Sequence, residues 1–177
     1  TSQLRRILGK YPILTNSIIY GTLCCGAETS QQTISKKNIG LAKSPQQMQI
    51  DTGAITRFTI YGTAVGGPIL TVWYRFLDSR IPGKSTQIAI KKALLDQFVF
   101  TPPLYLVFYV VMSILERKED VFEEFRNKFV KTFLGSCMFW MPIQGINFFL
   151  IPPAFRVVYV GACSFVWLNV ISWIKNQ

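Results

Sequence analysis

The stretch WMPIQGINFFLIPPAFR, residues 140–156, places strongly polar side chains inside a run that is otherwise apolar enough for lipid. These polar residues are Gln144, Asn147 and Arg156. On a helix, residues three and four apart share a face, so Trp140, Gln144 and Asn147 project from one stripe. Polar groups within a bilayer need protein or water as partners. We therefore expect the stripe to face a neighbouring helix or a watery cavity, not the lipid.

The composition of the whole chain favours a membrane protein. Of 177 residues, 50% are hydrophobic and only 16% are charged, and the mean hydropathy is positive, at +0.29. Soluble domains carry about 25% charged residues. An ordinary soluble domain is therefore the weaker interpretation.

Five apolar stretches approach the length of a membrane-crossing helix, for which about 20 residues are needed. They are residues 11–27, 58–77, 94–115, 133–151 and 154–174. The alternation of polar and apolar residues that a β-barrel requires is absent. We predict an all-α fold, a polytopic transmembrane helical bundle, in a single integral membrane domain over residues 1–177. It has four or five membrane-embedded helices. Because Pro152 and Pro153 bring the last two stretches so close together, four crossings are the expected number.

Residues 116–133 combine a charged face with an apolar one. The apolar residues recur at helical spacing and are Val121, Phe122, Phe125, Phe129 and Phe133. This pattern predicts an amphipathic surface helix that lies along the headgroups and leads into the next span. A solvated helix packed on a partner protein is the alternative.

Two polar connectors separate the predicted spans. Residues 28–51 are rich in Gln, Ser, Thr and Lys and form either a loop or an extension of the first helix. Residues 78–87 contain Pro82 and Gly83, a pair that signals a turn. We therefore expect neighbouring spans to be linked as hairpins.

The formal net charge of +10 raises the question of nucleic-acid binding. The Lys and Arg residues are spread over both sets of loops, whereas a nucleic-acid-binding protein gathers them on one face. Anionic lipid headgroups attract cations near the membrane surface with about 1 kcal/mol each. We expect anionic membrane lipids as partners and no direct contact with nucleic acid. The balanced loops do not select an orientation.

The cysteine and histidine content argues against catalysis. Cys24, Cys25, Cys137 and Cys163 lie in apolar stretches without C-x-x-C spacing, and the chain has no histidine. Packing is the expected role of the cysteines, with a redox-responsive thiol as the alternative. Without histidine, His-based metal sites and Ser-His or Cys-His catalysis are excluded. We expect no enzyme activity and no cofactor or metal.

The second apolar stretch contains a patch of small residues. Gly62 and Gly66 have GxxxG spacing, followed directly by Gly67 and Pro68. Such a patch lets another helix approach closely, so these four residues are helix-packing candidates. A proline at residue 68 can kink the span and free carbonyl groups.

Ionisable residues near the spans form a second group of candidates. Arg57 and Arg75 flank the second stretch, and Asp96 with Gln97 lies near the start of the third. Ionisable residues at membrane depth mark functional sites. The structural alternative pairs Lys92 with Asp96 across one helical turn and lets the arginines snorkel to the interface. Residues 101–103, Thr-Pro-Pro, are predicted to break the third helix.

Several spaced motifs resemble the Mpv-seventeen family of small mitochondrial and peroxisomal membrane proteins, which includes the peroxisomal membrane protein of twenty-two kilodaltons. They are GPILTVWY at 67–74, DQ at 96–97, WMPIQGINF at 140–148, and then Pro152, Arg156 and residues 167–172. YGTLCCGAE at 20–28 and FYVVMSIL at 108–115 are most similar to the Mpv-seventeen-like members. The resemblance covers nearly the whole chain. Thr71 departs from it, because the family usually has histidine there.

The resemblance implies a multi-pass protein of the mitochondrial inner membrane, with the peroxisomal membrane as the alternative. It also implies a weakly selective channel with a role in mitochondrial homeostasis, meaning reactive-oxygen control and mitochondrial DNA maintenance. The candidates for a pore or polar interior are Arg57, Asp96, Gln97, Gln144, Asn147 and Arg156. The candidate packing or interface anchors are Trp73, Tyr74, Trp140 and Trp167.

Two classes of function therefore stay open. In the first, the polar stripe lines a pore for small solutes, and the nearby arginines favour anionic metabolites. In the second, the chain is a non-conducting accessory or assembly subunit of a larger mitochondrial membrane complex. Its charged amphipathic segment and basic loops would then supply the contacts. A homo-oligomer is a further possible assembly.

Overall fold

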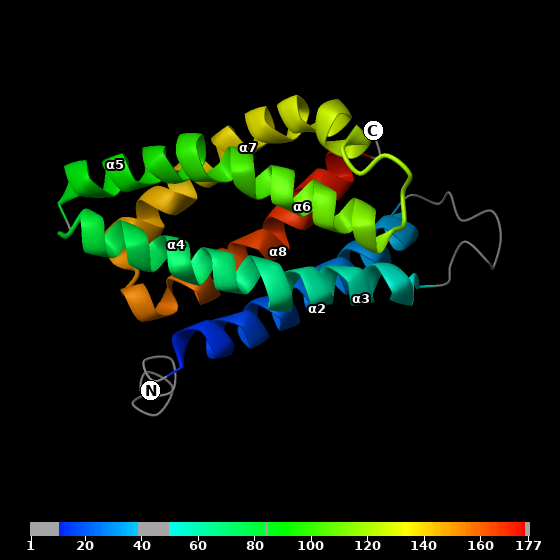
Figure 1. The fold of residues 1–177 in the computed structure, drawn as a ribbon, viewed down its shortest axis with the longest axis horizontal. Helices are drawn as coiled ribbons and strands as arrows, with labels where there is room; N and C mark the ends of the chain where they lie inside the picture. Colours follow the sequence, from blue (N-terminus) through cyan, green and yellow to red (C-terminus); the bar gives the residue numbers. More distant parts are fainter. Residues whose placement is uncertain (1–10, 39–49, 84, 176–177) are drawn as a thin grey trace.

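The computed structural model describes residues 11–38, 50–83 and 85–175, and every regular element within them is a helix. These helices line up in long segments that form an elongated bundle (Figure 1). The predicted all-α fold is thus confirmed for the described residues. The elements are α2 (Pro12–Asn38), α3 (Thr52–Tyr61), η2 (Gly62–Gly66), α4 (Gly67–Arg80), α5 (Thr86–Leu95), η3 (Asp96–Phe100), α6 (Thr101–Leu115), α7 (Glu123–Leu150), η4 (Pro153–Phe155) and α8 (Arg156–Lys175).

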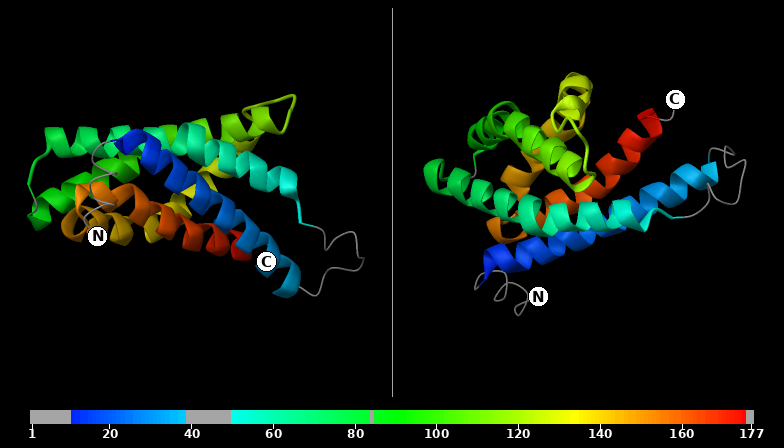
Figure 2. Two further views of the ribbon diagram at one scale, coloured as in Figure 1. Left: turned by 90° about the horizontal axis from the view of Figure 1, so that it is seen from below. Right: turned by 45° about the vertical axis from the view of Figure 1, so that its right-hand side comes forward.

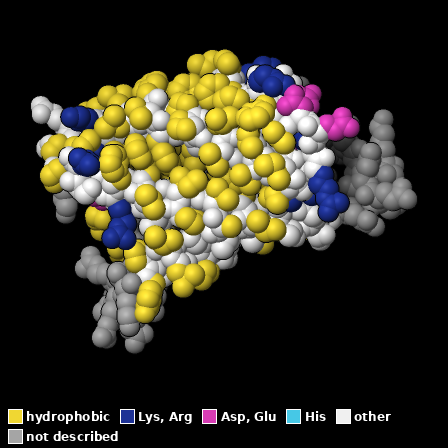
Figure 3. Space-filling model, viewed as in Figure 1, with side chains coloured by type: hydrophobic (Ala, Val, Ile, Leu, Met, Phe, Trp, Pro, Cys, Tyr) yellow, Lys and Arg dark blue, Asp and Glu magenta, His cyan; other side chains and the backbone are white. Residues whose placement is uncertain are grey.

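The outer surface of the bundle is apolar, as expected of helices in lipid. Large hydrophobic side chains such as Leu134, Met138 and Leu150 are exposed, and hydrophobic groups cover most of the face shown in Figure 3. Two helical segments among the described residues are long and apolar enough to cross a membrane, Thr86–Leu115 and Glu123–Leu150. Four or five crossings stay a prediction.

The segment α3–η2–α4 runs without interruption past Pro68. The five residues of η2 form a π-helical turn, in which the Gly67 N–H bonds to the Gly62 carbonyl. Pro68 follows directly, at one of the first two positions of α4, where it has no N–H to donate to the preceding turn. The wider turn therefore accommodates the proline within a continuous helix.

The segment α5–η3–α6 uses the same arrangement. In η3 the Thr101 N–H bonds to the Asp96 carbonyl, and the Thr101 hydroxyl donates to the same carbonyl at 2.9 Å. Pro102 follows at the start of α6. The predicted break at residues 101–103 is therefore wrong, because the helix continues through the π-helical turn η3 into α6, with the prolines at its first positions. Turns of this kind are frequent at functional sites.

The glycines of η2 lie against α2, which packs along both α8 and the α3–η2–α4 segment (Figure 2). A Cβ atom at Gly62 would lie 3.0 Å from the Gly21 Cα and 2.8 Å from the Cys24 Sγ. A Cβ atom at Gly67 would lie 2.6 Å from the Ser17 Cα. Only glycine permits this approach, so the patch of small residues brings the first two helical segments into direct contact.

The predicted amphipathic surface helix over residues 116–133 does not exist as a separate element. The chain turns after α6, with Arg117 in the left-handed region at φ 57°. The Asp120 carboxylate then accepts the Phe122 N–H at 2.9 Å. From Glu123 onward one helix, α7, runs to Leu150. The prediction was wrong because the helix that begins at Glu123 continues without a break into the apolar stretch, so the charged face belongs to the first turns of the span itself.

The connectors agree with the sequence where the structure describes them. Helix α2 continues to Asn38, so the polar linker begins as an extension of the first helix. Helices α4 and α5 are joined by a short turn that contains Gly83 at φ +122°. The predicted hairpin is thus confirmed. Residues 39–49 and the cations Arg5, Arg6, Lys10, Lys43 and Lys84 lie outside the described residues.

The hydrophobic core lies where α4, α5, α7 and α8 meet. It contains Leu70, Tyr74 and Leu77 of α4, together with small residues of α5 and Phe148 of α7. The small residues let α5 pack closely against α7. The core therefore lies at the same end of the bundle as most of the candidate polar residues.

Candidate functional site: a buried polar seam

Buried side chains in the described part of the bundle are as often polar as apolar. Fourteen polar or charged residues are buried, against fourteen hydrophobic ones. In a helical bundle surrounded by lipid, polar groups inside must find partners in one another. Several such groups lie side by side between α4, α5, η3, α7 and the start of α8, and together we call them the polar seam. Its members are Trp73, Tyr74, Asp78, Lys92, Asp96, Gln97, Ser136, Gln144, Asn147 and Arg156.

One end of the polar seam is an ion cluster in which one carboxylate serves two cations. The Lys92 Nζ donates to the Asp78 Oδ1 at 2.6 Å, and the Arg156 Nη1 contacts the same oxygen. Lys92 and Arg156 are 2% and 3% exposed, whereas the Asp78 side chain is 23% exposed. The cluster therefore carries one positive charge more than its carboxylate neutralises.

The surroundings of the ion cluster partly compensate for this excess charge. The Arg156 Nε donates to the Ile151 carbonyl at 3.2 Å. Arg156 and Lys92 both lie over the Phe148 ring, at 5.1 and 5.7 Å from its centroid. Carbonyl oxygens at the C-terminus of α7 and the face of an aromatic ring both attract cations. Arg156 thus ties the start of α8 to the ends of α4 and α7.

The middle of the polar seam contains the stripe predicted from residues 140–156. The Gln144 Nε2 donates to the Tyr74 hydroxyl at 2.9 Å, and the Asn147 Nδ2 donates to the Gln144 Oε1 at 2.8 Å. All three side chains are buried, and Asn147 is fully so. The stripe therefore faces α4, a neighbouring helix, which is one of the two environments expected from the sequence.

Asp96 joins the polar seam through the indole of Trp73. The Trp73 Nε1 donates to the Asp96 Oδ1 at 2.7 Å. The Trp73 ring also stacks on Phe100 at 4.5 Å between centroids, with 4° between the ring planes. Asp96 and Phe100 are the first and last residues of η3. The π-helical turn thus presents both a carboxylate and an aromatic ring to one tryptophan of α4.

Gln97 extends the polar seam to the middle of α7. Its Nε2 donates to the Ser136 Oγ at 2.9 Å and approaches the Cys137 Sγ at 3.3 Å. The Gln97 Oε1 is buried without a protein partner, as are the Asn147 Oδ1 and the Ser113 Oγ. Buried polar atoms of this kind call for water.

Two sequence predictions about ionisable residues are not met. Lys92 does not pair with Asp96 one turn away on its helix, because Asp78 offers it a carboxylate at 2.6 Å. Arg57 does not join the polar seam. Its guanidinium lies 3.7 Å from Asp51 and 3.8 Å from Glu116, so it links α3 to the turn after α6.

The four candidate aromatic anchors contact other helices of the bundle. Tyr74 and Trp167 are buried, and Trp73 bonds to Asp96. Trp140 lies edge-on to Trp167, with 6.4 Å between the ring centroids, so these two rings join α7 to α8. Of the two roles predicted for these residues, packing is the one that this placement fits.

Thr71 takes the place of the histidine expected from the motif. Its hydroxyl donates to the Gly67 carbonyl at 2.7 Å and accepts from the Asn16 Nδ2 at 3.3 Å. Thr71 is 2% exposed. The hydroxyl therefore bridges α4 to α2 and supplies no group that titrates near neutral pH.

Sequence reasoning missed Asp78 as a member of the site. The sequence pattern assigns this residue to the start of the polar connector at residues 78–87. The available signal was its position at the end of an apolar stretch, in a chain that has only nine acidic residues. An isolated acid at the edge of a span is a natural counter-ion for cations on neighbouring helices.

Comparison with known proteins agrees with the motif resemblance. Residues 113–172 match the model of the Mpv17 / PMP22 family. The chain is 33% identical to an Mpv17-like protein of Xenopus laevis over 168 residues, which cover 95% of this chain and 79% of that protein. The chain belongs to the Mpv17 / PMP22 family. Protein sym1 of Aspergillus oryzae is a family member 32% identical to it, over 96% of this chain and 94% of that protein.

The Mpv17 / PMP22 family also includes a relative with a named location. Peroxisomal membrane protein 2 of Bos taurus is 29% identical over 168 residues, which cover 94% of this chain and 84% of that protein. No solved structure matches the chain. As a member of the Mpv17 / PMP22 family, the chain is a membrane protein, and the family match at residues 113–172 includes Ser136, Gln144, Asn147 and Arg156 of the polar seam.

Proposed function

We propose that this protein is a non-catalytic channel of the mitochondrial inner membrane that lets small solutes pass with weak selectivity along the polar seam. The peroxisomal membrane is the alternative location, which the bovine relative named peroxisomal membrane protein 2 supports. The proposed role is in mitochondrial homeostasis, including reactive-oxygen control and mitochondrial DNA maintenance. Anionic lipids are its proposed surroundings.

The observation that carries this proposal is the polarity of the bundle interior. Polar and ionisable groups inside a membrane bundle are expensive and mark solute pathways. Here they extend from the Asp78 ion cluster through Gln144 to Gln97, and some of their oxygen atoms have no protein partner. Water entering to satisfy the Asn147 Oδ1 and the Gln97 Oε1 would hydrate this path.

The charges at the Asp78 end of the path favour anions. Lys92 and Arg156 share a single carboxylate, that of Asp78. A solute moving past this end of the bundle therefore meets a net positive charge, and rings or clusters of Lys and Arg select anions in pores. We propose weak anion preference, in keeping with anionic metabolites as solutes.

Reconstitution into liposomes tests the proposal. The wild-type chain should conduct, and its reversal potential in a KCl gradient should shift toward the chloride equilibrium potential. Asn147→Leu replaces a buried amide of the path with an apolar side chain of similar size. We expect its conductance to fall by about tenfold, the effect of about 1.4 kcal/mol on a barrier.

A matched control separates the path from the general effect of removing a polar group. Thr22 lies on the exposed side of α2, and its hydroxyl donates to the Ile18 carbonyl of its own helix. Thr22→Leu should conduct like the wild type. Circular dichroism must show the same helical content for both variants. Wild-type liposomes no leakier than empty ones, or equal losses in the two variants, would refute conduction along the polar seam.

The second candidate function is that of a non-conducting accessory subunit of a larger mitochondrial membrane complex. The observation that favours it is an exposed apolar row on α7, Val130, Leu134 and Met138, spaced four residues apart and 63%, 63% and 85% exposed. Such a row suits packing against another membrane helix. Co-migration of the chain with a large complex on a native gel would support this function. Migration as a monomer or small homo-oligomer would count against it.

A further inference from the structure

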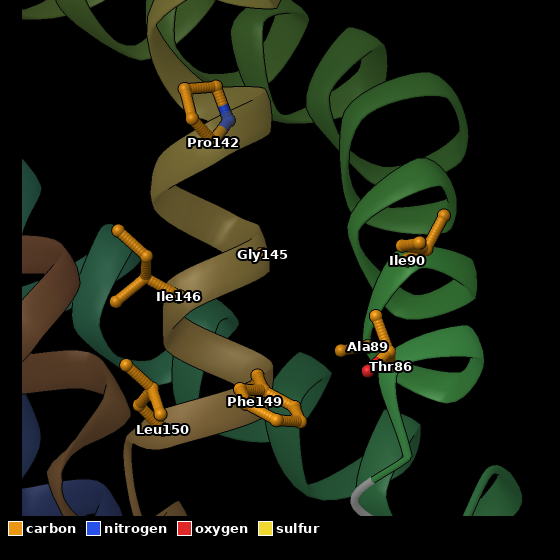
Figure 4. A pocket seen from close by; sticks show the side chains of 8 residues that line it. All are labelled: Thr86, Ala89, Ile90, Pro142, Gly145, Ile146, Phe149 and Leu150. Atoms are coloured by element: carbon orange, nitrogen blue, oxygen red, sulfur yellow. The ribbon is translucent and has the colours of Figure 1, made fainter.

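An open apolar groove lies on the outer surface between α5 and the C-terminal part of α7 (Figure 4). Its volume is about 310 Å³. Gly145, which has no side chain, leaves this space beside Ala89, and the larger side chains of Ile90, Ile146 and Phe149 line it. A Cβ atom at Gly145 would meet no atom within 4 Å. The bundle itself therefore does not fill the groove.

The groove extends from the end of the bundle toward its middle. It includes Thr86, the first residue of α5, and Leu150, the last residue of α7. From Leu150 inward to Pro142 the helix rises about 12 Å, against about 15 Å for the hydrocarbon of one leaflet. The groove thus begins at headgroup level and follows the direction of a lipid tail. Its shape fits an acyl chain better than a compact solute.

The charges at this end of the bundle indicate which lipid would bind. The described cations near the α4–α5 and α7–α8 turns outnumber the acids, and in Figure 3 most of the visible Asp and Glu side chains lie at the opposite end. An anionic headgroup is therefore attracted more strongly to this end than to the other, where acids offset most of the cations. The cations are Arg75, Arg80, Lys91, Lys92 and Arg156, and the acid among them is Asp78. The opposite end has the acids Glu28, Asp51, Glu116, Glu119, Asp120, Glu123 and Glu124, and among them the cations Arg57, Arg117, Lys118, Arg126, Lys128 and Lys131.

We propose that the groove binds one acyl chain of an anionic phospholipid. The chain lies between Ala89 and Gly145, and the phosphate lies at the outer end of the groove, toward the exposed side chains of Arg80 and Lys91. Filling the groove replaces a surface gap by van der Waals contact, and the basic end distinguishes the headgroup. This site does not depend on whether the polar seam conducts.

Native mass spectrometry of the full chain tests the proposal. The protein is released from nanodiscs that contain phosphatidylcholine and phosphatidylglycerol in equal amounts. Wild-type protein should retain phosphatidylglycerol in preference to phosphatidylcholine. Gly145→Leu fills the groove and should reduce the retained phosphatidylglycerol by about tenfold, equivalent to about 1.4 kcal/mol.

Matched variants control each part of the argument. Gly26 of α2 also has no atom within 4 Å of an added Cβ, so Gly26→Leu should retain phosphatidylglycerol like the wild type. Arg80→Gln combined with Lys91→Gln should remove the headgroup preference, whereas Lys131→Gln at the opposite end should not. Ile90→Trp fills the groove from α5 and should repeat the effect of Gly145→Leu if that variant folds poorly.

Three results would overturn the proposal. The first is equal retention of phosphatidylglycerol by Gly145→Leu and the wild type. The second is equal retention of the two lipids by the wild-type chain. The third is a dimer that Gly145→Leu abolishes while lipid retention is unchanged, since the groove would then hold a second copy of this chain.

Discussion

The ion cluster at the end of the polar seam leads to a prediction based on charge balance. Lys92 and Arg156 contact the same oxygen of Asp78, and both cations are nearly inaccessible to solvent. Asp78→Asn leaves two buried cations without a counter-ion. Removing one partner of a buried pair costs about 3–5 kcal/mol. Because the Asp78 side chain is 23% exposed, we expect the lower limit, about 3 kcal/mol, or roughly a hundredfold in the unfolding equilibrium.

Lys92→Met provides the decisive comparison. The cluster has a net charge of one positive unit in the wild type, two in Asp78→Asn, and none in Lys92→Met. Lys92→Met should therefore destabilise the bundle by less than Asp78→Asn, since a neutral Asp78–Arg156 pair is left. Asp78→Asn combined with Lys92→Met should recover about 1–2 kcal/mol relative to Asp78→Asn alone, within the range of coupling energies between contacting residues.

The free energies of unfolding can be measured in detergent micelles by titration with SDS, followed by circular dichroism. The order of the three variants is the result that matters. If Lys92→Met destabilises as much as Asp78→Asn, or if the double variant is the sum of the single ones, charge balance does not hold the cluster together. The lysine would then stabilise the bundle mainly through packing of its apolar stem.

Two further predictions concern the packing of α2 and the turn after α6. Gly62→Leu drives a side chain into Gly21 and Cys24, so it should destabilise the bundle by about 1–3 kcal/mol in the same titration; Gly26→Leu, with open space around it, should not. Hydrogen bonds from the Phe122 N–H and from Arg126 lower the pKa of the Asp120 carboxyl. The stabilisation of the turn by these contacts is therefore present above the ordinary aspartate pKa, and it is lost as the pH falls through the lowered pKa. The test is the rate of amide hydrogen exchange at Phe122, measured by NMR between pH 6 and about 2.5 and divided by the intrinsic exchange rate. This ratio should rise only at the acidic end of the range. An Asp120→Asn variant should not show the rise.

Residue spacing was enough to predict which way several side chains of the polar seam face. The sequence predicts that Gln144 and Asn147 face a helix or a cavity, because residues one turn apart in an apolar helix lie on the same face. The structure places them against Tyr74. The prediction for Lys92 was wrong for a related reason. Spacing offered Asp96 as a partner on the same helix, whereas the carboxylate of Asp78 on a neighbouring helix lies close enough to bond.

The sequence by itself determined the properties that depend on local pattern: helices of membrane-crossing length, the hairpin at Gly83, the small-residue patch at Gly62 and the polar stripe of α7. Only the tertiary structure decided which partners these groups meet. Asp78 and Arg156 are 78 residues apart in the chain, and their contact depends on how four helix ends converge. Residues 140–156 show the same division. Helical periodicity places Gln144 and Asn147 on one face, whereas the position of α4 determines that Gln144 meets the Tyr74 hydroxyl. Side-chain direction is a local consequence of helix geometry, whereas the identity of a partner depends on the packing of distant segments.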